Sequence, residues 1–97
     1  MKIYLAGKIY GNEDYKQQFK SAARRYSKGG QNIILNPAVM PEGLKPNDYM
    51  RMSFAMIDAA DMVVFLDGWR ESRGAMLEFA YCAYIDKPTF DESGVEI

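Results

Sequence analysis

The sequence predicts one small α/β domain over residues 1–97, a doubly wound three-layer sandwich with a mostly parallel sheet of about four strands in the order 2-1-3-4. The first reason is that short apolar runs, "KIYLAG", "NIILNP" and "MVVFLDG", alternate with segments of helical periodicity. The second is that the strand in "MVVFLDG" is apolar at every position and so on both of its faces, which is typical of a central parallel strand. The third is length, because 97 residues suffice for one core but not for a second domain.

The first half of the chain contains two expected strands and one helix. "KIYLAG" is a β-branched and aromatic run that ends at a glycine, and "KIYGNE" after it has the composition of a loop. A helix is expected from Asp14 until Gly29 and Gly30 end its pattern. "NIILNP" is the second strand, ended by Asn36 and Pro37. The apolar positions of the helix are Tyr15, Phe19, Ala22, Ala23 and Tyr26.

The second half begins with a connection to Pro46 that is longer than the usual 4 to 6 residues, and long connections in compact domains are often functional. Pro46 and Asn47 open a helix through about Ala60, with apolar residues on two sides. We expect the sheet to cover one side and a second subunit to cover the other. "MVVFLDG" is the third strand, a turn and a helix to about Asp86 follow, and "KPTF" begins a fourth strand.

Composition excludes several classes of function. The net charge is −1 with dispersed charges, so no basic stripe indicates binding to a nucleic acid duplex. No apolar run approaches the roughly 20 residues that span a bilayer, and no signal peptide is recognisable. We therefore expect no membrane association and a soluble, cytoplasmic protein. The fold ends early for this architecture, so an exposed sheet edge or an apolar helix face favours a homodimer or higher homo-oligomer.

The inventory of reactive side chains limits the chemistry further. Cys82 is the only cysteine, so neither an internal disulfide nor a thiolate metal cluster is possible within the chain. There is no histidine, which excludes Ser-His and Cys-His nucleophile pairs and the usual zinc sites. Any catalysis must come from carboxylates, tyrosines, lysines or backbone dipoles, and we expect no cofactor and no metal.

The predicted ligand crevice lies at the carboxyl ends of the strands, beside the switch between the first and third strands. Two loops, 7–12 and 67–72, face each other there. Lys8 is an exposed cation by default and a phosphate partner at best. Tyr10 and Trp69 could stack on a base, although aromatic residues are more often simply packed. The other candidate ligand-binding positions in these loops are Gly7, Ile9 and Asp67.

Glu78 is the single carboxylate of the apolar run "GAMLEFAYCAY". Counted from an N-cap at Ser72, it falls in the second turn of the last helix. Its neighbours at three and four residues offer no polar partner of the kind that surface glutamates usually have. It either marks a narrow solvated stripe, or pairs with Arg51 or Arg73, or is a partly desolvated carboxylate at a ligand site.

The start of the same helix also has two interpretations. Ser72, Arg73 and Gly74 are either a cap, a solvated cation and a turn residue, or an anion site. In the second case, free N–H groups and a small glycine let a phosphate approach the backbone. Tyr4, on a central strand, is a core residue unless its hydroxyl reaches Glu78.

Four segments, "YLAGKIYG", "NP", "DYMR" and "GWRESRGAMLE", together resemble a family of small phage and bacterial proteins of unassigned function. That family is related to the nucleoside 2-deoxyribosyltransferases, whose superfamily includes the 2'-deoxynucleoside 5'-phosphate N-hydrolases. The resemblance covers about residues 2 to 90 and implies a Rossmann-like fold. It further implies that Glu78 is a nucleophile and that Tyr4 orients it.

The same resemblance implies which branch the site is similar to. Where the transferases have an aspartate six residues before the glutamate, this chain has Ser72, as in the phosphate-binding hydrolases. Lys8 occupies a position that is a serine in the hydrolases. Close relatives carry an aspartate after the "YMR" element, where this chain has Ser53.

The sequence thus predicts an N-glycosidase or base transferase acting on (deoxy)ribonucleoside 5'-monophosphates through Glu78. A second hypothesis is a non-catalytic protein that sequesters a nucleotide or an ADP-ribose-type signal in the same pocket. The replacement of the aspartate by Ser53 favours this second hypothesis, and the presence of Glu78 favours the first. A third is a protein-interaction role of the second helix.

Overall fold

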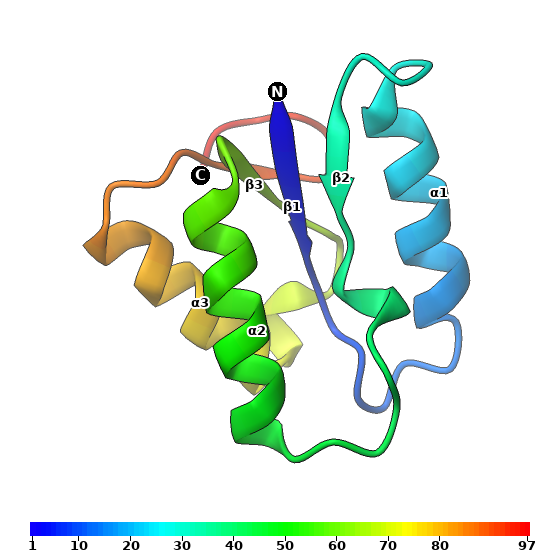
Figure 1. Ribbon diagram of the computed structural model, residues 1–97, viewed down its shortest axis with the longest axis vertical. Coiled ribbons are helices and arrows are strands. Elements are labelled where there is room, and N and C mark those ends of the chain that lie inside the picture. Colours follow the sequence, from blue (N-terminus) through cyan, green and yellow to red (C-terminus); the bar gives the residue numbers. More distant parts are fainter.

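The computed structural model describes residues 1–97, and it confirms the predicted α/β fold (Figure 1). One parallel sheet has the strand order β2-β1-β3-β4. Its strands are β1 (Lys2–Ala6), β2 (Ile33–Leu35), β3 (Met62–Phe65) and β4 (Thr89–Asp91). The helices are α1 (Tyr15–Ser27), α2 (Pro46–Ala59) and α3 (Arg73–Tyr84), with short 3-10 turns η1 (Pro37–Val39) and η2 (Trp69–Glu71).

Both faces of the sheet are buried. Successive strand residues point to opposite faces, so each strand contributes side chains to both. Ile3 and Leu5 of β1 pack in a cluster with Phe19 of α1. Tyr4, between them, belongs to a second cluster that includes Ile57 of α2 and residues of α3. Helix α1 therefore covers one face, and α2 and α3 cover the other (Figure 1). This alternation directs the Tyr4 side chain toward α2 and α3.

Helix α3, rather than a second subunit, covers the second apolar side of α2. The ring of Phe54 stacks on that of Tyr81 with centroids 4.3 Å apart. The Tyr81 hydroxyl then donates a hydrogen bond of 2.6 Å to the Asp58 carboxylate. The expectation that a second subunit covers this side of α2 is therefore wrong, because a neighbouring helix of the same chain does so.

The chain after β4 turns back and covers the outer edge of that strand. Phe90 and Glu96 form an antiparallel bridge, and the backbone N–H of Ile97 donates to the carbonyl of Thr89. The Asp91 carboxylate holds the turn by accepting from the N–H groups of Ser93 and Val95. An exposed sheet edge at β4, one of the two grounds for expecting an oligomer, is therefore absent.

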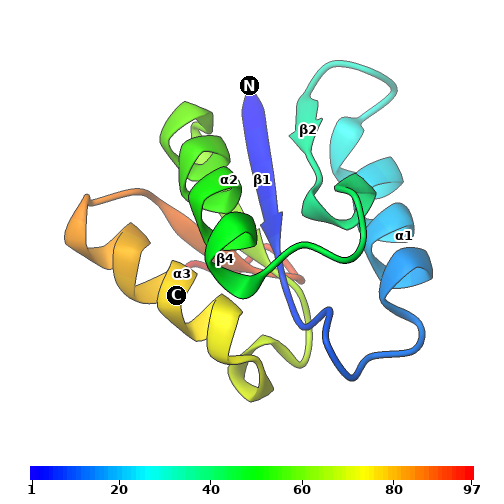
Figure 2. The same ribbon diagram turned by 60° about the horizontal axis from the view of Figure 1, so that its bottom comes forward.

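All four strands run in the same direction, so their carboxyl ends meet at one end of the molecule. Helices α1, α2 and α3 all begin at that end, and the loop after β1 passes beside it (Figure 2). No helix is both long enough and apolar enough to cross a membrane. The fold thus gathers the N-termini of all three helices and the predicted crevice loops at one place.

Candidate active site

A buried tyrosine and a buried glutamate form the centre of the candidate site. The Tyr4 hydroxyl, from the middle of β1, donates a hydrogen bond of 2.5 Å to Oε2 of Glu78 in α3. The exposed fractions of the two residues are 1% and 4%. Neither Arg51 nor Arg73 pairs with Glu78. The interpretations of Glu78 as a solvated stripe or an arginine partner are therefore wrong, and the condition set for a role of Tyr4 is met.

The local sequence explains why Glu78 lies there. Ser72 is the N-cap of α3, and its side-chain oxygen accepts a hydrogen bond of 3.1 Å from the Ala75 N–H. This start directs Ala75, Glu78 and Cys82 toward the core. Gly74 lets α2 approach, because a Cβ there would lie 3.2 Å from the Met50 methyl carbon. The Ser72 cap and the small Gly74 therefore set both the rotation and the closeness of the helix that carries Glu78.

Burial perturbs the acidity of both members of the pair. Desolvation raises the pKa of Glu78 to about 7, while hydrogen bonds from Tyr4 and Ser53 act in the opposite direction. Burial, together with the Glu78 charge and the hydrogen bond to it, holds the pKa of Tyr4 well above its ordinary value. Tyr4 therefore remains a proton donor in a hydrogen bond, and Glu78 changes its ionisation near neutral pH.

Ser53 of α2 lies beside this pair, with 3% of its surface exposed. It lowers the pKa of both Tyr4 and Glu78, so its hydroxyl is close enough to act on each of them. Sequence reasoning treated Ser53 only as the replacement of an acid and did not predict this contact. The available signal was a lone serine among the apolar residues of α2, four positions before the buried Ile57.

The N-terminus of α3 retains two free backbone donors. The N–H groups of Arg73 and Gly74 have no acceptor in the chain, whereas that of Ala75 is satisfied by Ser72. The Arg73 side chain is exposed and rises from the helix face that also carries Leu77, away from the side of Glu78. The structure thus leaves backbone donors at this helix start but does not bring the Arg73 guanidinium to the Tyr4–Glu78 pair.

The two predicted loops do meet. The ammonium of Lys8 lies 3.5 Å from the carboxylate of Glu71, which belongs to η2. Gly7 has a packing role, since a Cβ there would lie 3.1 Å from the Phe19 ring and 3.3 Å from the Leu66 Cβ. Ile9 packs against the core cluster under α1. The start of this loop is thus packed at Gly7 and Ile9, and Lys8 between them forms a partly exposed ion pair.

The remaining candidates of these loops differ in accessibility. Tyr10 is 96% exposed and free to contact a ligand. The side chain of Asp67 is exposed, while its backbone carbonyl accepts from Gln18 and its N–H donates to Glu92. Trp69 is only 5% exposed. Of the two aromatic residues predicted to contact a base, Tyr10 is therefore the accessible one.

Trp69 requires a correction. Its ring packs against Phe65 and Phe79 at centroid distances of 4.8 and 4.9 Å. The guanidinium of Arg70 lies 4.6 Å from the ring centroid and covers it. The prediction that Trp69 stacks on a base is wrong, because protein groups occupy the surfaces of the indole. The turn η2 that carries Trp69 is instead anchored to the core by it.

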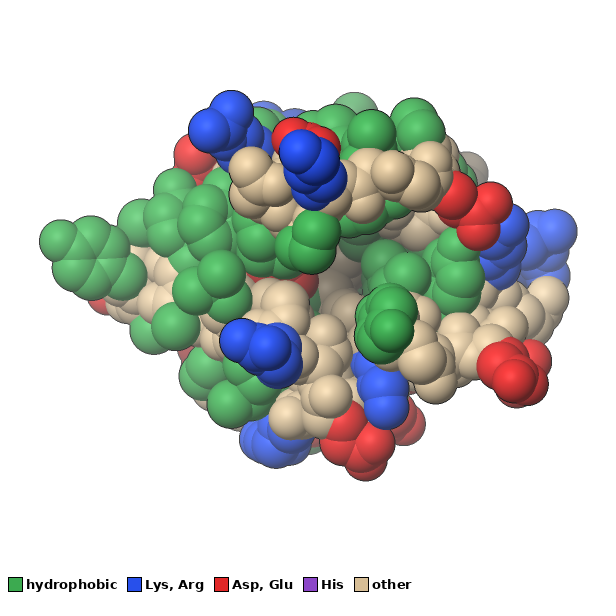
Figure 3. Space-filling model, turned by 90° about the horizontal axis from the view of Figure 1, so that it is seen from below, with side chains coloured by type: hydrophobic (Ala, Val, Ile, Leu, Met, Phe, Trp, Pro, Cys, Tyr) green, Lys and Arg blue, Asp and Glu red, His purple; other side chains and the backbone are tan.

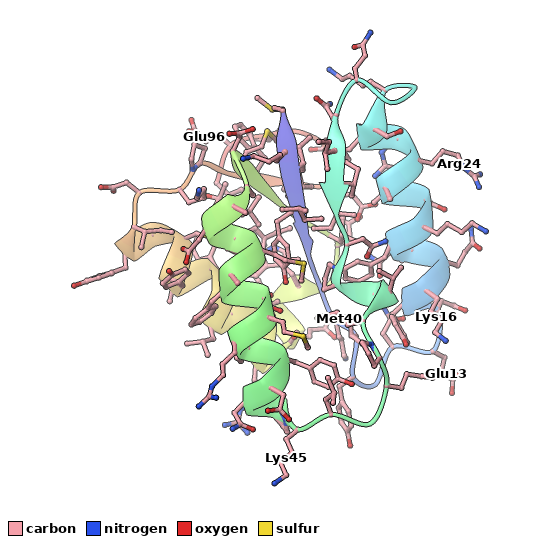
Figure 4. All side chains as sticks on the ribbon, viewed as in Figure 1. Glu13, Lys16, Arg24, Met40, Lys45 and Glu96 are labelled. Atoms are coloured by element: carbon pink, nitrogen blue, oxygen red, sulfur yellow. The ribbon has the colours of Figure 1, made fainter.

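The face of the molecule seen from below is hollowed at its centre (Figure 3). This is the end at which the strands finish and α2 and α3 begin. A separate groove of about 630 Å³ is lined by residues of α1 and of the segment 36–42, among them Lys16 and Met40, which are labelled in Figure 4. None of the predicted site residues lines that groove. No group of three or more His, Cys, Asp or Glu residues is placed to hold a metal ion.

The fold and the site together define an α/β sandwich with a buried carboxylate near the carboxyl ends of its central strands. Residues 1–90 match the model of the family described as "Domain of unknown function (DUF4406)", and the chain belongs to this family. A search of curated protein sequences finds no match.

Among solved structures, the chain is similar to a 2-deoxyribosyltransferase from the psychrotolerant bacterium Bacillus psychrosaccharolyticus, described as a biocatalyst for the synthesis of nucleosides. The TM-score is 0.69 at 19% sequence identity, and the match covers 94% of this chain and 71% of the other. This likeness shows that the two proteins share the α/β fold.

Proposed function

We propose that the protein is an N-glycosidase or base transferase that acts on (deoxy)ribonucleoside 5'-monophosphates, with Glu78 as the nucleophile. The observation that carries the proposal is the 2.5 Å hydrogen bond between the Tyr4 hydroxyl and the buried Glu78 carboxylate. Carboxylates with perturbed pKa values near a crevice are typical of catalytic sites. The fold shared with a 2-deoxyribosyltransferase gives further support.

The proposed reaction needs only groups that the chain supplies. Ionised Glu78 attacks the anomeric carbon, a C–O bond to the carboxylate forms, and the bond from that carbon to the base nitrogen breaks. The bonding electron pair leaves with the base, which takes a proton from solvent. Water or a second base then displaces Glu78 from the glycosyl ester, which restores the free carboxylate. Tyr4 holds Oε2 of Glu78, so that Oε1 is the attacking atom.

The start of α3 supports the choice of a monophosphate. A phosphate would accept from the free N–H groups of Arg73 and Gly74, where the helix dipole favours negative charge. Lys8 is held close by through its ion pair with Glu71, and its ammonium would have to turn from that carboxylate to the phosphate to contribute. Glu78 is one and a half turns further along the same helix, so that phosphate and sugar would lie along its first turns.

A second function, a binding protein that sequesters a nucleotide or an ADP-ribose-type signal, is favoured by one observation. The residue beside Tyr4 and Glu78 is Ser53, so the buried site has a single carboxylate. Most glycosidases use a second acid to protonate the leaving group. A site without that acid is suited to binding a nucleotide with slow turnover or none.

The two functions are distinguished by incubating the protein with a panel of nucleosides and nucleoside 5'-monophosphates and measuring released base by chromatography. An enzyme releases base from a monophosphate, and Glu78→Ala loses this activity. Glu13→Gln, which changes an exposed carboxylate far from the pair, is the matched control and retains it. Tight binding by calorimetry with no base release supports sequestration. Base release at the parental rate by Glu78→Ala contradicts the proposed mechanism.

A further inference from the structure

Helix α3 is apolar on the side that faces away from the protein as well as on the buried side. We call the exposed residues Met76, Leu77, Ala80, Ala83 and Tyr84 the outer face of α3. The exposed fractions of Met76, Leu77 and Tyr84 are 48%, 50% and 89%. By contrast, the exposed face of α1 carries Lys16, Gln17, Lys20 and Arg24. Helices that are apolar all round are normally covered on both sides.

The outer face lies at the side of the molecule and is accessible to a partner. Figure 1 shows α3 as the outermost helix beside α2, and Figure 3 shows hydrophobic side chains gathered on the same side. A groove of about 340 Å³ continues this surface between the last turns of α3 and the chain end. Its lining includes the acidic residues Asp86 and Glu96 and one basic residue, Lys87, whose ammonium donates to the backbone carbonyls of Asp58 and Ala60.

The charges at the two ends of the outer face are opposite. Arg73, at the N-terminal end, forms no ion pair within the chain, and neither Asp86 nor Glu96 at the other end does. Helix dipoles add to this pattern, because a cation is favoured near a helix C-terminus. A surface that is apolar in the middle, positive at one end and negative at the other is complementary to an antiparallel copy of itself.

We propose that the outer face of α3 binds the same face of a second copy of this chain, with the two helices antiparallel about a two-fold axis near Ala80. The small side chain of Ala80 lets the helices approach closely at the crossing point. Leu77 of each copy then packs toward Tyr84 of the other. Arg73 of each copy reaches Asp86 and Glu96 of the other. The interface lies on the side of α3 opposite Glu78, so it does not depend on the proposed catalytic function.

Sedimentation velocity over a concentration series tests the interface. The parent is expected to be a dimer, and Leu77→Glu a monomer, because the substitution would bury two unpaired carboxylates, one from each copy, in the apolar part of the interface. Lys20→Glu, which places a glutamate at an exposed position of α1, is the control and stays dimeric. Circular dichroism establishes that each variant is folded.

A charge exchange tests the antiparallel arrangement. Arg73→Glu and Asp86→Arg are each expected to raise the dimer dissociation constant about tenfold, because each places like charges opposite one another. The double variant restores opposite charges across the two-fold axis and recovers the parental dissociation constant. A monomeric parent overturns the proposal, as does a Leu77→Glu variant that dimerises like the parent. Failure of the double variant to recover the dissociation constant overturns the antiparallel pairing.

Discussion

The hydroxyl of Tyr4 lies 2.5 Å from the carboxylate of Glu78, although the two residues are 74 positions apart in the sequence. The pair joins the middle of β1 to the second turn of α3, and its two residues are only 1% and 4% exposed. Its burial makes the ionisation of Glu78 a determinant of stability as well as of reactivity.

The first prediction concerns stability and pH. The pKa of Glu78 is about 7 in the folded protein and near its ordinary 4.5 when unfolded, so the folded state binds the proton more tightly. The contribution of Glu78 to the free energy of unfolding is therefore fully present below pH 4.5 and is lost as pH rises through 7. The total loss is about 3 kcal/mol. Glu78→Gln removes this dependence. Urea unfolding at acidic and alkaline pH should show the variant gaining about 3 kcal/mol relative to the parent as pH rises.

The matched control for that experiment is Glu13→Gln, which neutralises an exposed carboxylate. Its difference from the parent in free energy of unfolding should stay constant over the same pH range. A Glu78→Gln difference that is equally constant would show that the Glu78 carboxyl titrates normally.

The second prediction concerns the hydrogen bond itself. Tyr4→Phe removes the donor that lowers the pKa of Glu78, so this pKa should rise further while burial stays the same. The loss of a donor to a buried carboxyl should destabilise the fold by about 1 to 3 kcal/mol. Carbon-13 NMR of the Glu78 carboxyl as a function of pH measures the change. A Glu78 pKa equal to that of the parent would contradict the role of Tyr4.

The third prediction separates the cap of α3 from a phosphate site. Ser72→Asp and Ser72→Asn both retain an N-cap oxygen for the Ala75 N–H, so both should fold with stability within about 1 kcal/mol of the parent. Only the aspartate adds a negative charge where the phosphate is proposed to bind. Calorimetry should show that Ser72→Asp binds nucleoside 5'-monophosphates more weakly than Ser72→Asn, with equal affinities for nucleosides. Equal monophosphate affinities would remove the phosphate site from this helix start.

The fourth prediction compares two glycines with neighbours at similar distances. A Cβ at Gly7 would press on the Phe19 ring and the Leu66 Cβ, so Gly7→Ala should cost about 1 to 3 kcal/mol. At Gly74 the neighbour is the methyl end of the flexible Met50, and alanine is the better helix former, so the net change should stay within about 1 kcal/mol. Thermal unfolding of the two variants gives the comparison. A Gly74→Ala variant destabilised more than Gly7→Ala would contradict this packing.

Local patterns in the sequence were sufficient to predict the sheet order, and a partly desolvated Glu78 was one of three interpretations that they left open. Alternating apolar runs and helical periodicity determine a parallel sheet, and a carboxylate without polar neighbours indicates burial. The environment of Trp69 could not be predicted, because its partners Phe65 and Phe79 come from both sides of it in the chain and meet only in the fold. The same holds for Phe54 and Tyr81, whose stacking covers the second side of α2.

The return of the chain over β4 did leave a signal in the sequence. Asp91 and Gly94 in "DESG" are typical turn residues, and an aspartate that accepts from the backbone two residues on is the common way to begin such a turn. The only signal in the sequence for the position of Ser53 beside Tyr4 and Glu78 is that it is a polar residue among the apolar residues of α2. Which strand residue a buried serine meets depends on the packing of α2 against β1, which periodicity does not specify.

The most direct test of the central claim, that Glu78 is the nucleophile, is the rate of base release from a deoxyribonucleoside 5'-monophosphate by the parent and by Glu78→Gln. Glutamine has nearly the same shape, and its carbonyl can still accept from Tyr4, so the fold should be retained. The claim predicts that the parent releases base and that the variant releases it at least about a thousandfold more slowly. Equal rates of base release in the two proteins would contradict it.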